Sequence, residues 1–152
     1  KAMERLHEEG LIRSIGLSNF MQHHAEPVMA KGNICPMVDQ IEYHPGFTQK
    51  ECVEFCQKNN ILVEAWSPLG RGNVLDNPLL KSIASNYGKS VAQVVIRWVM
   101  QTGVLPLVKS VTPSRIKENF DVFDFELSQQ EMLEIASLKT DRIGSDPDTC
   151  DF

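Results

Sequence analysis

The segment from Lys109 to Asn119 holds residue types that can bind a phosphate. Thr112 and Pro113 predict a helix start, because Thr is a common cap and Pro suits the first helical position. The free N–H groups and the dipole of such a start favour an anion, and Lys109 and Arg115 add two full positive charges beside it. An ordinary capped surface helix with two solvated cations fits the same residues.

Alternating strands and helices are expected to position this segment. Apolar runs predict strands at about residues 14–17, 36–42, 61–66 and 104–108. Helical spacing of apolar residues, with start and stop signals, predicts helices at about 1–9, 21–31, 48–58, 77–87 and 91–101, one from 112, and one from 128 to about 138. Runs that are apolar on both faces predict a parallel sheet that is covered by helices or closed into a barrel. Four such units amount to half of a (β/α)₈ barrel.

Helix starts are the most specific local signals. The capping-box spacing of Ser or Thr followed three residues later by Glu or Gln occurs at Thr48, Ser90 and Ser128. Ser18 and Asn19 are cap-type residues ahead of the helix at 21–31, and Pro27 is expected to break or restart that helix.

Composition excludes several classes of protein. A chain of 152 residues with a net charge of −5 and a pI near 5.3 fits one globular domain and argues against a general nucleic-acid binder, which needs a basic face. The sequence predicts no membrane segment and no secretory leader, so we expect a cytoplasmic protein. The four scattered cysteines are expected to be reduced thiols. Cys52 and Cys56 share a helix face and could bind a metal with other ligands, but neighbouring apolar residues favour packing, and no metal site is predicted.

Polar residues follow every predicted strand. They lie at 18–19, 40–44, 66–72 and 109–119. In a (β/α)₈ barrel the carboxyl ends of the strands build the active site, and phosphate is commonly held after the last two strands. The sequence therefore predicts one site along this edge of the sheet.

Four motifs resemble those of the aldo-keto reductase family, in the family's order and approximate spacing. They are Gly16–Phe20, Gln40–Pro45, Trp66–Gly70 and Lys109–Pro113. The resemblance covers nearly the whole chain and is nearest to the small monomeric microbial NADPH-dependent reductases. It implies a parallel (β/α)₈ TIM barrel, in which residues 1–152 form a single carboxyl-terminal half-barrel with the NADPH-binding side. Residues 139–152 would be its carboxyl-terminal loop.

The resemblance implies a place for the nicotinamide end of NADPH. In the family a Ser-Asn pair and the Gln of the next strand bind the carboxamide, which here means Ser18, Asn19 and Gln40; Asn and Gln supply both donors and acceptors. Trp66 matches the aromatic residue that stacks on the nicotinamide ring. Each has a structural alternative: a helix cap for Ser18, a strand residue that meets a neighbour's backbone for Gln40, and core packing for Trp66.

The resemblance also implies which residues contact the rest of NADPH. Ser67 and Leu69 are expected at the pyrophosphate and the nearby ribose, where backbone N–H groups of an irregular loop can donate to an anion. The 2′-phosphate and adenine contacts of the family match Lys109, Ser110 and Arg115 at the phosphate, and Glu118 and Asn119 near the adenine. Two fixed cations favour NADPH over NADH.

The implied activity of the parent protein is hydride transfer from NADPH to a small aldehyde or ketone. The family's catalytic Asp, Tyr, Lys and His lie in the first half of its barrel, before the position of Lys1. No catalytic residue is therefore assigned, and the isolated 152-residue chain is expected to be inactive. Tyr43 and His44 do not match the catalytic pair and are expected to be structural, and His7, His23 and His24 are expected at the surface.

The implied half-barrel has unpaired sheet edges. Such edges favour pairing with the first half of the barrel or with a second copy of the chain. Two other functions fit the sequence, namely a non-catalytic nucleotide-binding regulatory subunit, which shares this fold, and an inactive half-barrel without a ligand. The short link from Gly70 to the helix after Asn77 favours the small reductases.

Overall fold

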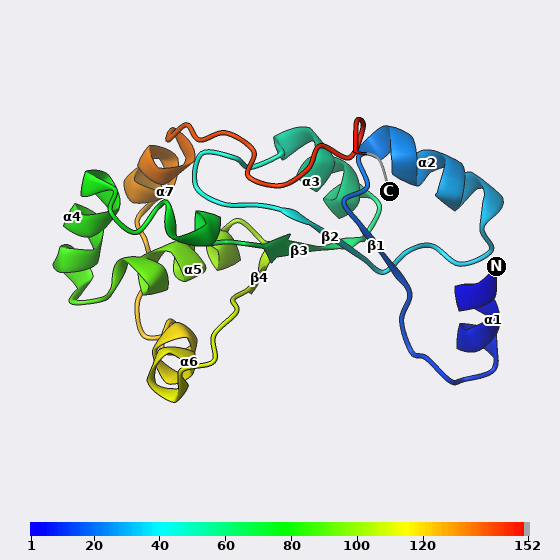
Figure 1. Ribbon diagram of the computed structural model, residues 1–152, viewed down its shortest axis with the longest axis horizontal. Coiled ribbons are helices and arrows are strands. Elements are labelled where there is room, and N and C mark those ends of the chain that lie inside the picture. Colours follow the sequence, from blue (N-terminus) through cyan, green and yellow to red (C-terminus); the bar gives the residue numbers. More distant parts are fainter. Residues whose placement is uncertain (151–152) are drawn as a thin grey trace.

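Four parallel strands form the sheet of the computed structural model, which describes residues 1–150 (Figure 1). They are β1 (Gly16–Ser18), β2 (Val38–Glu42), β3 (Leu62–Trp66) and β4 (Leu105–Leu107), in the order β1-β2-β3-β4. Ser18 pairs with Gln40, and Trp66 pairs with Leu107, so the carboxyl ends of the strands lie at one edge. The predicted alternation of parallel strands and helices is confirmed.

Helices connect the strands. They are α1 (Ala2–Glu8), α2 (Gln22–Lys31), α3 (Lys50–Lys58), α4 (Pro78–Tyr87), α5 (Val91–Gln101), α6 (Pro113–Phe120) and α7 (Gln129–Ala136), with a 3₁₀ turn at Gly70–Gly72. The capping boxes at Ser90 and Ser128 are formed as predicted, and Asn77 Oδ1 accepts the N–H of Leu79 and Leu80. Within residues 1–150, no helix combines the length and the apolar character needed to cross a membrane.

Two predicted helix features are wrong. Pro27 does not break α2, which runs continuously past it from its cap at Met21 to Gly32, because one missing N–H does not end a helix that is fixed at both ends. Neither Ser18 nor Asn19 is its cap. The capping box at Thr48 is not formed; Gln49 is the cap of α3, at φ 44°, and its Nε2 donates to the Glu42 carbonyl oxygen. A contact with the preceding strand overrides the local signal there.

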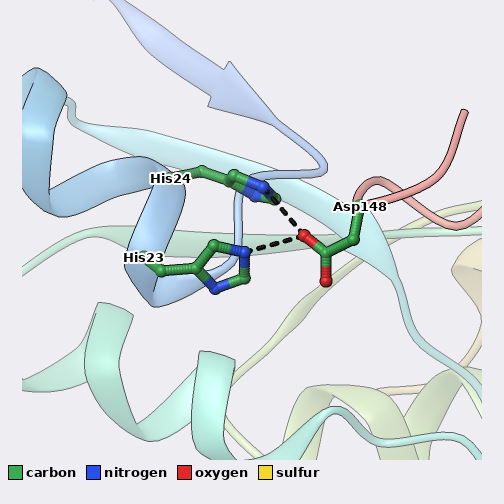
Figure 2. Close-up of side chains that lie close together, drawn as sticks. All are labelled: His23, His24 and Asp148. Carbon is green, nitrogen blue, oxygen red and sulfur yellow. Dashed lines mark hydrogen bonds and ion pairs between the residues drawn. The ribbon is translucent and has the colours of Figure 1, made fainter. Parts of the chain in front are cut away.

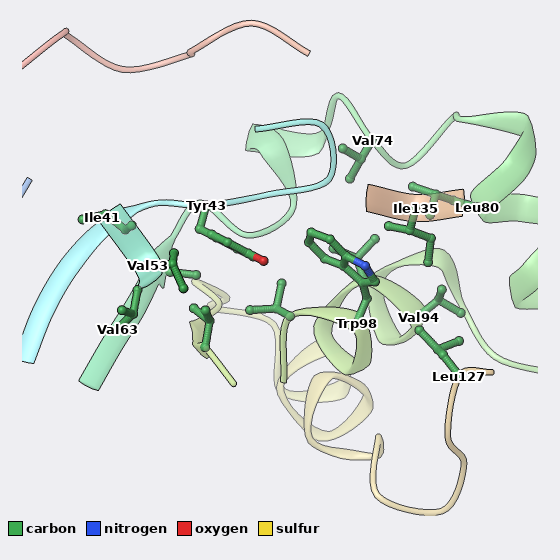
Figure 3. Packing of buried hydrophobic residues seen from close by; sticks show 14 of the residues in the cluster. Ile41, Tyr43, Val53, Val63, Val74, Leu80, Val94, Trp98, Leu127 and Ile135 are labelled. Atoms are coloured by element: carbon green, nitrogen blue, oxygen red, sulfur yellow. The ribbon is translucent and has the colours of Figure 1, made fainter. Parts of the chain in front are cut away.

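One face of the sheet carries the core. Ile41, Val63 and Ala65 are fully buried in one cluster with Trp98 of α5. Figure 3 shows Ile41, Val63 and Trp98 in this cluster. The Trp98 ring stacks on Tyr43 with centroids 5.5 Å apart, and its Nε1 donates to the Met132 carbonyl oxygen at 3.2 Å. Trp98 therefore connects the end of β2 to α7.

The opposite face of the sheet lacks a covering layer of helices among the described residues. Leu62, Leu105 and Leu107 on this face are 48%, 44% and 39% exposed. Between them, β2 and β3 alternate and present Gln40 and Glu64. The expectation of strands that are apolar on both faces therefore fails on this side only at Gln40 and Glu64. Parallel sheets are normally covered on both faces, so this face can accept another layer.

Candidate cofactor site

The ends of the first three strands hold the predicted nicotinamide residues close together. Asn19, at φ 58°, donates its backbone N–H to the Gln40 carbonyl oxygen at 2.9 Å. Its side-chain Oδ1 accepts the indole N–H of Trp66 at 2.7 Å. The side-chain Nε2 of Gln40 donates to Glu64 Oε2 at 3.0 Å. Gln40 therefore bonds a neighbouring side chain, whereas its structural alternative was a bond to a neighbour's backbone. Ser18, the register partner of Gln40, completes the group.

Trp66 lies at the wall of a hollow of about 850 Å³. Ser18, Asn19 and Arg71 line the same hollow, and Trp66 is half-buried, so core packing does not account for it. The hollow thus presents an indole ring beside amide and hydroxyl groups. Such a lining suits a flat ring that carries a polar amide.

A second hollow, of about 400 Å³, surrounds the start of α6. Six of the predicted residues line it: Leu69, Lys109, Ser110, Arg115, Glu118 and Asn119. Thr112 is the N-cap residue of α6 and Pro113 follows it, as predicted, but within residues 1–150 the Thr112 side chain makes no hydrogen bond to the first turn of the helix. Ser110 Oγ instead accepts the N–H of Thr112 at 3.2 Å. The first-turn N–H groups are therefore left for an anion.

The loop after β3 joins the two hollows. Ser67 adopts φ 51°, and its carbonyl oxygen accepts the N–H of Gly70 at 2.8 Å, which tightens the turn. Trp66 lines the first hollow and Leu69 the second, whereas Ser67 lines neither of these two among the described residues. A ligand with an aromatic end and a phosphate end can span both hollows along this loop.

Four residues of the carboxyl-terminal tail line the first hollow, namely Gly144, Ser145, Pro147 and Cys150. The tail is a loop, as predicted, and it runs from α7 back toward α2 (Figure 1); residues 151–152 of the predicted tail lie outside the described residues. Glu42, fully buried, accepts the N–H of Ile143 at 2.7 Å and of Gly144 at 2.9 Å. These bonds hold the Gly144 backbone against the Trp66 ring.

Gly144→Ala is expected to displace the tail from Trp66. A Cβ at this position would lie 2.4 Å from Trp66 Cη2, closer than two carbon atoms can approach. Acrylamide quenching of Trp fluorescence should therefore increase, since the buried Trp98 contributes little to it. Ser145→Ala is the matched control because Ser145 lines the same hollow and already has a Cβ. Equal quenching of Gly144→Ala and the parent chain would contradict this contact.

Two histidines bind the end of the tail to α2 (Figure 2). The Nε2 atoms of His23 and His24 lie 2.7 Å and 2.9 Å from Asp148 Oδ1. His24 Nδ1 accepts the N–H of Met21 at 3.1 Å, so Nε2 carries the ring proton and donates to Asp148. The hydrogen bond from His23 lowers the pKa of Asp148. Both histidines are near the surface, as expected, but only the fold brings Asp148 to them.

Tyr43 and His44 are buried, as expected for structural residues. Burial raises the pKa of Tyr43, whereas a tyrosine that donates a proton near neutral pH needs a lower one. His44 Nε2 donates to Glu42 Oε1 at 3.0 Å. Both residues therefore support the end of β2.

The model of the Aldo/keto reductase family matches residues 1–140. The chain belongs to this family. It is 50% identical to the uncharacterized oxidoreductase YtbE of Bacillus subtilis, over 100% of this chain and 55% of that protein. It is also 50% identical to the glyoxal reductase of the same organism, over 97% of this chain and 54% of that protein.

Solved structures of aldo-keto reductases agree with the fold. A mutant of Gox0644 in complex with NADPH matches with a TM-score of 0.95 and 42% identity, over 99% of this chain and 56% of that one. The chain thus spans about half the length of the curated relatives and of this structure. Its four-stranded parallel sheet corresponds to about half of an aldo-keto reductase barrel.

Proposed function

We propose that this chain forms the NADPH-binding side of an aldo-keto reductase that reduces a small aldehyde or ketone to an alcohol. The observation that carries the proposal is the pair of joined hollows, one beside Trp66 and one around the uncapped start of α6. Among the relatives are a glyoxal reductase and, at 44% identity, the methylglyoxal reductase DkgA of Escherichia coli strain K12. Both names describe reduction of small carbonyl compounds.

The first hollow offers hydrogen bonds that match a nicotinamide carboxamide. Asn19 Oδ1 already accepts the Trp66 N–H, so the Asn19 amide NH₂ remains to donate to the carboxamide oxygen. Gln40 does not line this hollow but pairs with Ser18 in the sheet, and its Nε2 already donates to Glu64, so its Oε1 would be the atom that accepts the carboxamide NH₂. Ser18 adds a hydroxyl beside them. When bound here, NADPH supplies the hydride, and these residues fix the orientation of the ring that carries it.

The second hollow suits a 2′-phosphate. Lys109 and Arg115 provide two full charges, and Ser110 and the first-turn N–H groups of α6 provide neutral donors. Glu118 and Asn119 follow on the same helix and would lie near the adenine. A dianionic phosphate gains more from these cations than a ribose hydroxyl does, which favours NADPH over NADH.

The catalytic Asp, Tyr, Lys and His of the family have no assigned position in this chain. We therefore propose that they belong to the other half of a complete barrel, which would pack on the uncovered sheet face. The isolated chain would bind the cofactor without reducing a carbonyl compound, as a non-catalytic nucleotide-binding subunit also would. A second copy of the chain could cover the same face and the free sheet edges.

Titration of the purified chain with NADPH and NADH, followed by Trp fluorescence, tests the proposal. We expect quenching that saturates with NADPH at much lower concentration than with NADH. Lys109→Ala and Arg115→Ala should each weaken NADPH binding about tenfold or more, the effect of losing one charge-assisted hydrogen bond, and leave NADH binding unchanged.

Lys117→Ala is the matched control, because Lys117 lies on α6 but lines a different hollow with Phe120 and Phe123. It should leave both affinities unchanged. Equal affinity for the two nucleotides, or no saturable response to either, would contradict the proposal that these residues form the cofactor site in this chain. Turnover of methylglyoxal by the isolated chain would contradict the assignment of catalysis to the other half.

A further inference from the structure

Asp39 is a buried carboxylate with no cationic partner among the described residues. It lies on β2 and points to the covered face of the sheet, with 0% of its surface exposed. Neither Oδ1 nor Oδ2 has a hydrogen-bond partner of normal geometry among the described residues, and the Phe20 backbone N–H offsets only part of the effect of burial on the Asp39 pKa. A buried carboxylate in this state is costly, so its environment calls for a proton or a cation. The proposed cofactor site does not use it, because it lies on the opposite side of the strand from Gln40.

Two thiols face this carboxylate. Cys52 and Cys56 lie one turn apart on α3, so both project from the same side of the helix, and both are buried. Their Sγ atoms and an Asp39 oxygen all lie within 4.8 Å of one another. Zinc binds thiolates at about 2.3 Å and carboxylates at about 2.0 to 2.2 Å, so small side-chain rotations bring all three donors to one ion.

A backbone oxygen borders the two thiols. The Phe20 carbonyl oxygen, in the loop after β1, lies 3.4 Å from Cys52 Sγ and accepts its S–H. Two thiolates and a carboxylate are all ligand types that zinc binds, and three protein ligands leave one position of a tetrahedral site for a water molecule.

We propose that Asp39, Cys52 and Cys56 bind a zinc ion between β2 and α3. The ion displaces the thiol protons and gives the Asp39 carboxylate the positive partner that it lacks. Because Asp39 and Gln40 are neighbours on β2, the ion also stabilises the strand that presents Gln40 to the candidate cofactor site. This inference goes beyond the proposed function and does not depend on it.

The surface group of His23, His24 and Asp148 in Figure 2 is less suited to a metal, although its ligand atoms also lie within 4.8 Å of one another. His24 Nε2 carries a proton, since Nδ1 accepts the Met21 N–H. A metal on Nε2 would require the proton at Nδ1 and would break that bond at the start of α2. His23, His24 and Asp148 therefore act as a hydrogen-bonded tether for the tail.

Zinc titration of the whole reduced, metal-free chain, in competition with a chromophoric chelator, tests the proposal. We expect one tightly bound zinc per chain and a higher melting temperature when zinc is present. Cobalt(II), used as a spectroscopic probe, should give intense thiolate-to-metal charge-transfer bands. Cys52→Ser, Cys56→Ser and Asp39→Asn should each weaken zinc binding about tenfold or more, because each removes a ligand.

Cys35→Ser and His23→Ala are the controls. Cys35 is an exposed thiol outside the group, and His23 belongs to the surface tether, so neither change should alter zinc affinity. Zinc binding that survives in the Cys52→Ser/Cys56→Ser double variant, or that is lost in His23→Ala, would overturn the proposal. If a cysteine variant fails to fold, the cobalt spectrum of the parent chain decides alone: no thiolate bands means no site.

Discussion

Glu42→Ala is expected to lower the free energy of unfolding by about 3 to 5 kcal/mol, the usual effect of removing one partner from a buried polar group. The Glu42 carboxylate accepts bonds from His44 Nε2 and from the N–H groups of Ile143 and Gly144. Alanine leaves all three donors buried or half-buried without an acceptor and opens a cavity at the end of β2.

Urea denaturation of the parent and variant chains measures this loss. Glu54→Ala is the control, because Glu54 is an exposed residue of α3 whose ion pair with Lys50 spans 3.6 Å. Its effect should stay within about 0.5 kcal/mol. Glu42→Gln keeps the shape of the side chain but loses one acceptor oxygen, so its effect should be about 1 to 3 kcal/mol.

Amide hydrogen exchange separates the tail from the rest of the fold. In Glu42→Ala the N–H groups of Ile143 and Gly144 should exchange much faster, since their acceptor is gone. The N–H groups of α5, which lies in the core around Trp98, should exchange faster only as far as the loss of global stability requires. Unchanged protection at Ile143 and Gly144 would show that Glu42 does not hold the tail.

Local signals in the sequence were enough for most of the fold. Ser90 and Ser128 start their helices with side chains three residues away, so the pattern and the contact lie within one turn. Thr48 and Pro27 show where this fails. Gln49, and not Thr48, caps α3 because its side chain reaches the Glu42 carbonyl oxygen of the preceding strand. A contact between separate elements cannot be inferred from spacing within one of them.

The candidate site likewise contains residues that the local sequence could predict and residues that only the fold brings together. Residues at or directly after the end of a strand, such as Trp66 and Asn19, were predictable because parallel strands end at one edge. Arg71 and the tether between the tail and His23 were missed. Asp148 lies 125 residues from His23 in the chain, and only the course of the tail across the sheet brings them together. Gly144 offered one weak signal, a glycine that allows the backbone to approach Trp66 closely.

Asp39→Asn is expected to change how stability depends on pH in metal-free protein. Burial raises the pKa of Asp39 to about 6, from a usual value of 3.8. Between these values the folded chain binds more protons than the unfolded chain, so folded-state stability falls as pH rises from about 4 to 6. The difference in pKa corresponds to about 3 kcal/mol, lost in full above this window.

Asparagine removes the charge and keeps the shape, so this pH-dependent loss should disappear. The free energy of unfolding of Asp39→Asn relative to the parent chain should rise by about 2 kcal/mol between pH 4 and pH 7, measured by urea denaturation in EDTA. Asp76→Asn is the control with the opposite sign: the hydrogen bond from Lys81 lowers the pKa of the exposed Asp76, so stability is lost only as pH falls. Parallel pH profiles for Asp39→Asn and the parent chain would mean that Asp39 already has a partner for its charge in the folded protein, and that the buried thiols do not face an unpaired carboxylate.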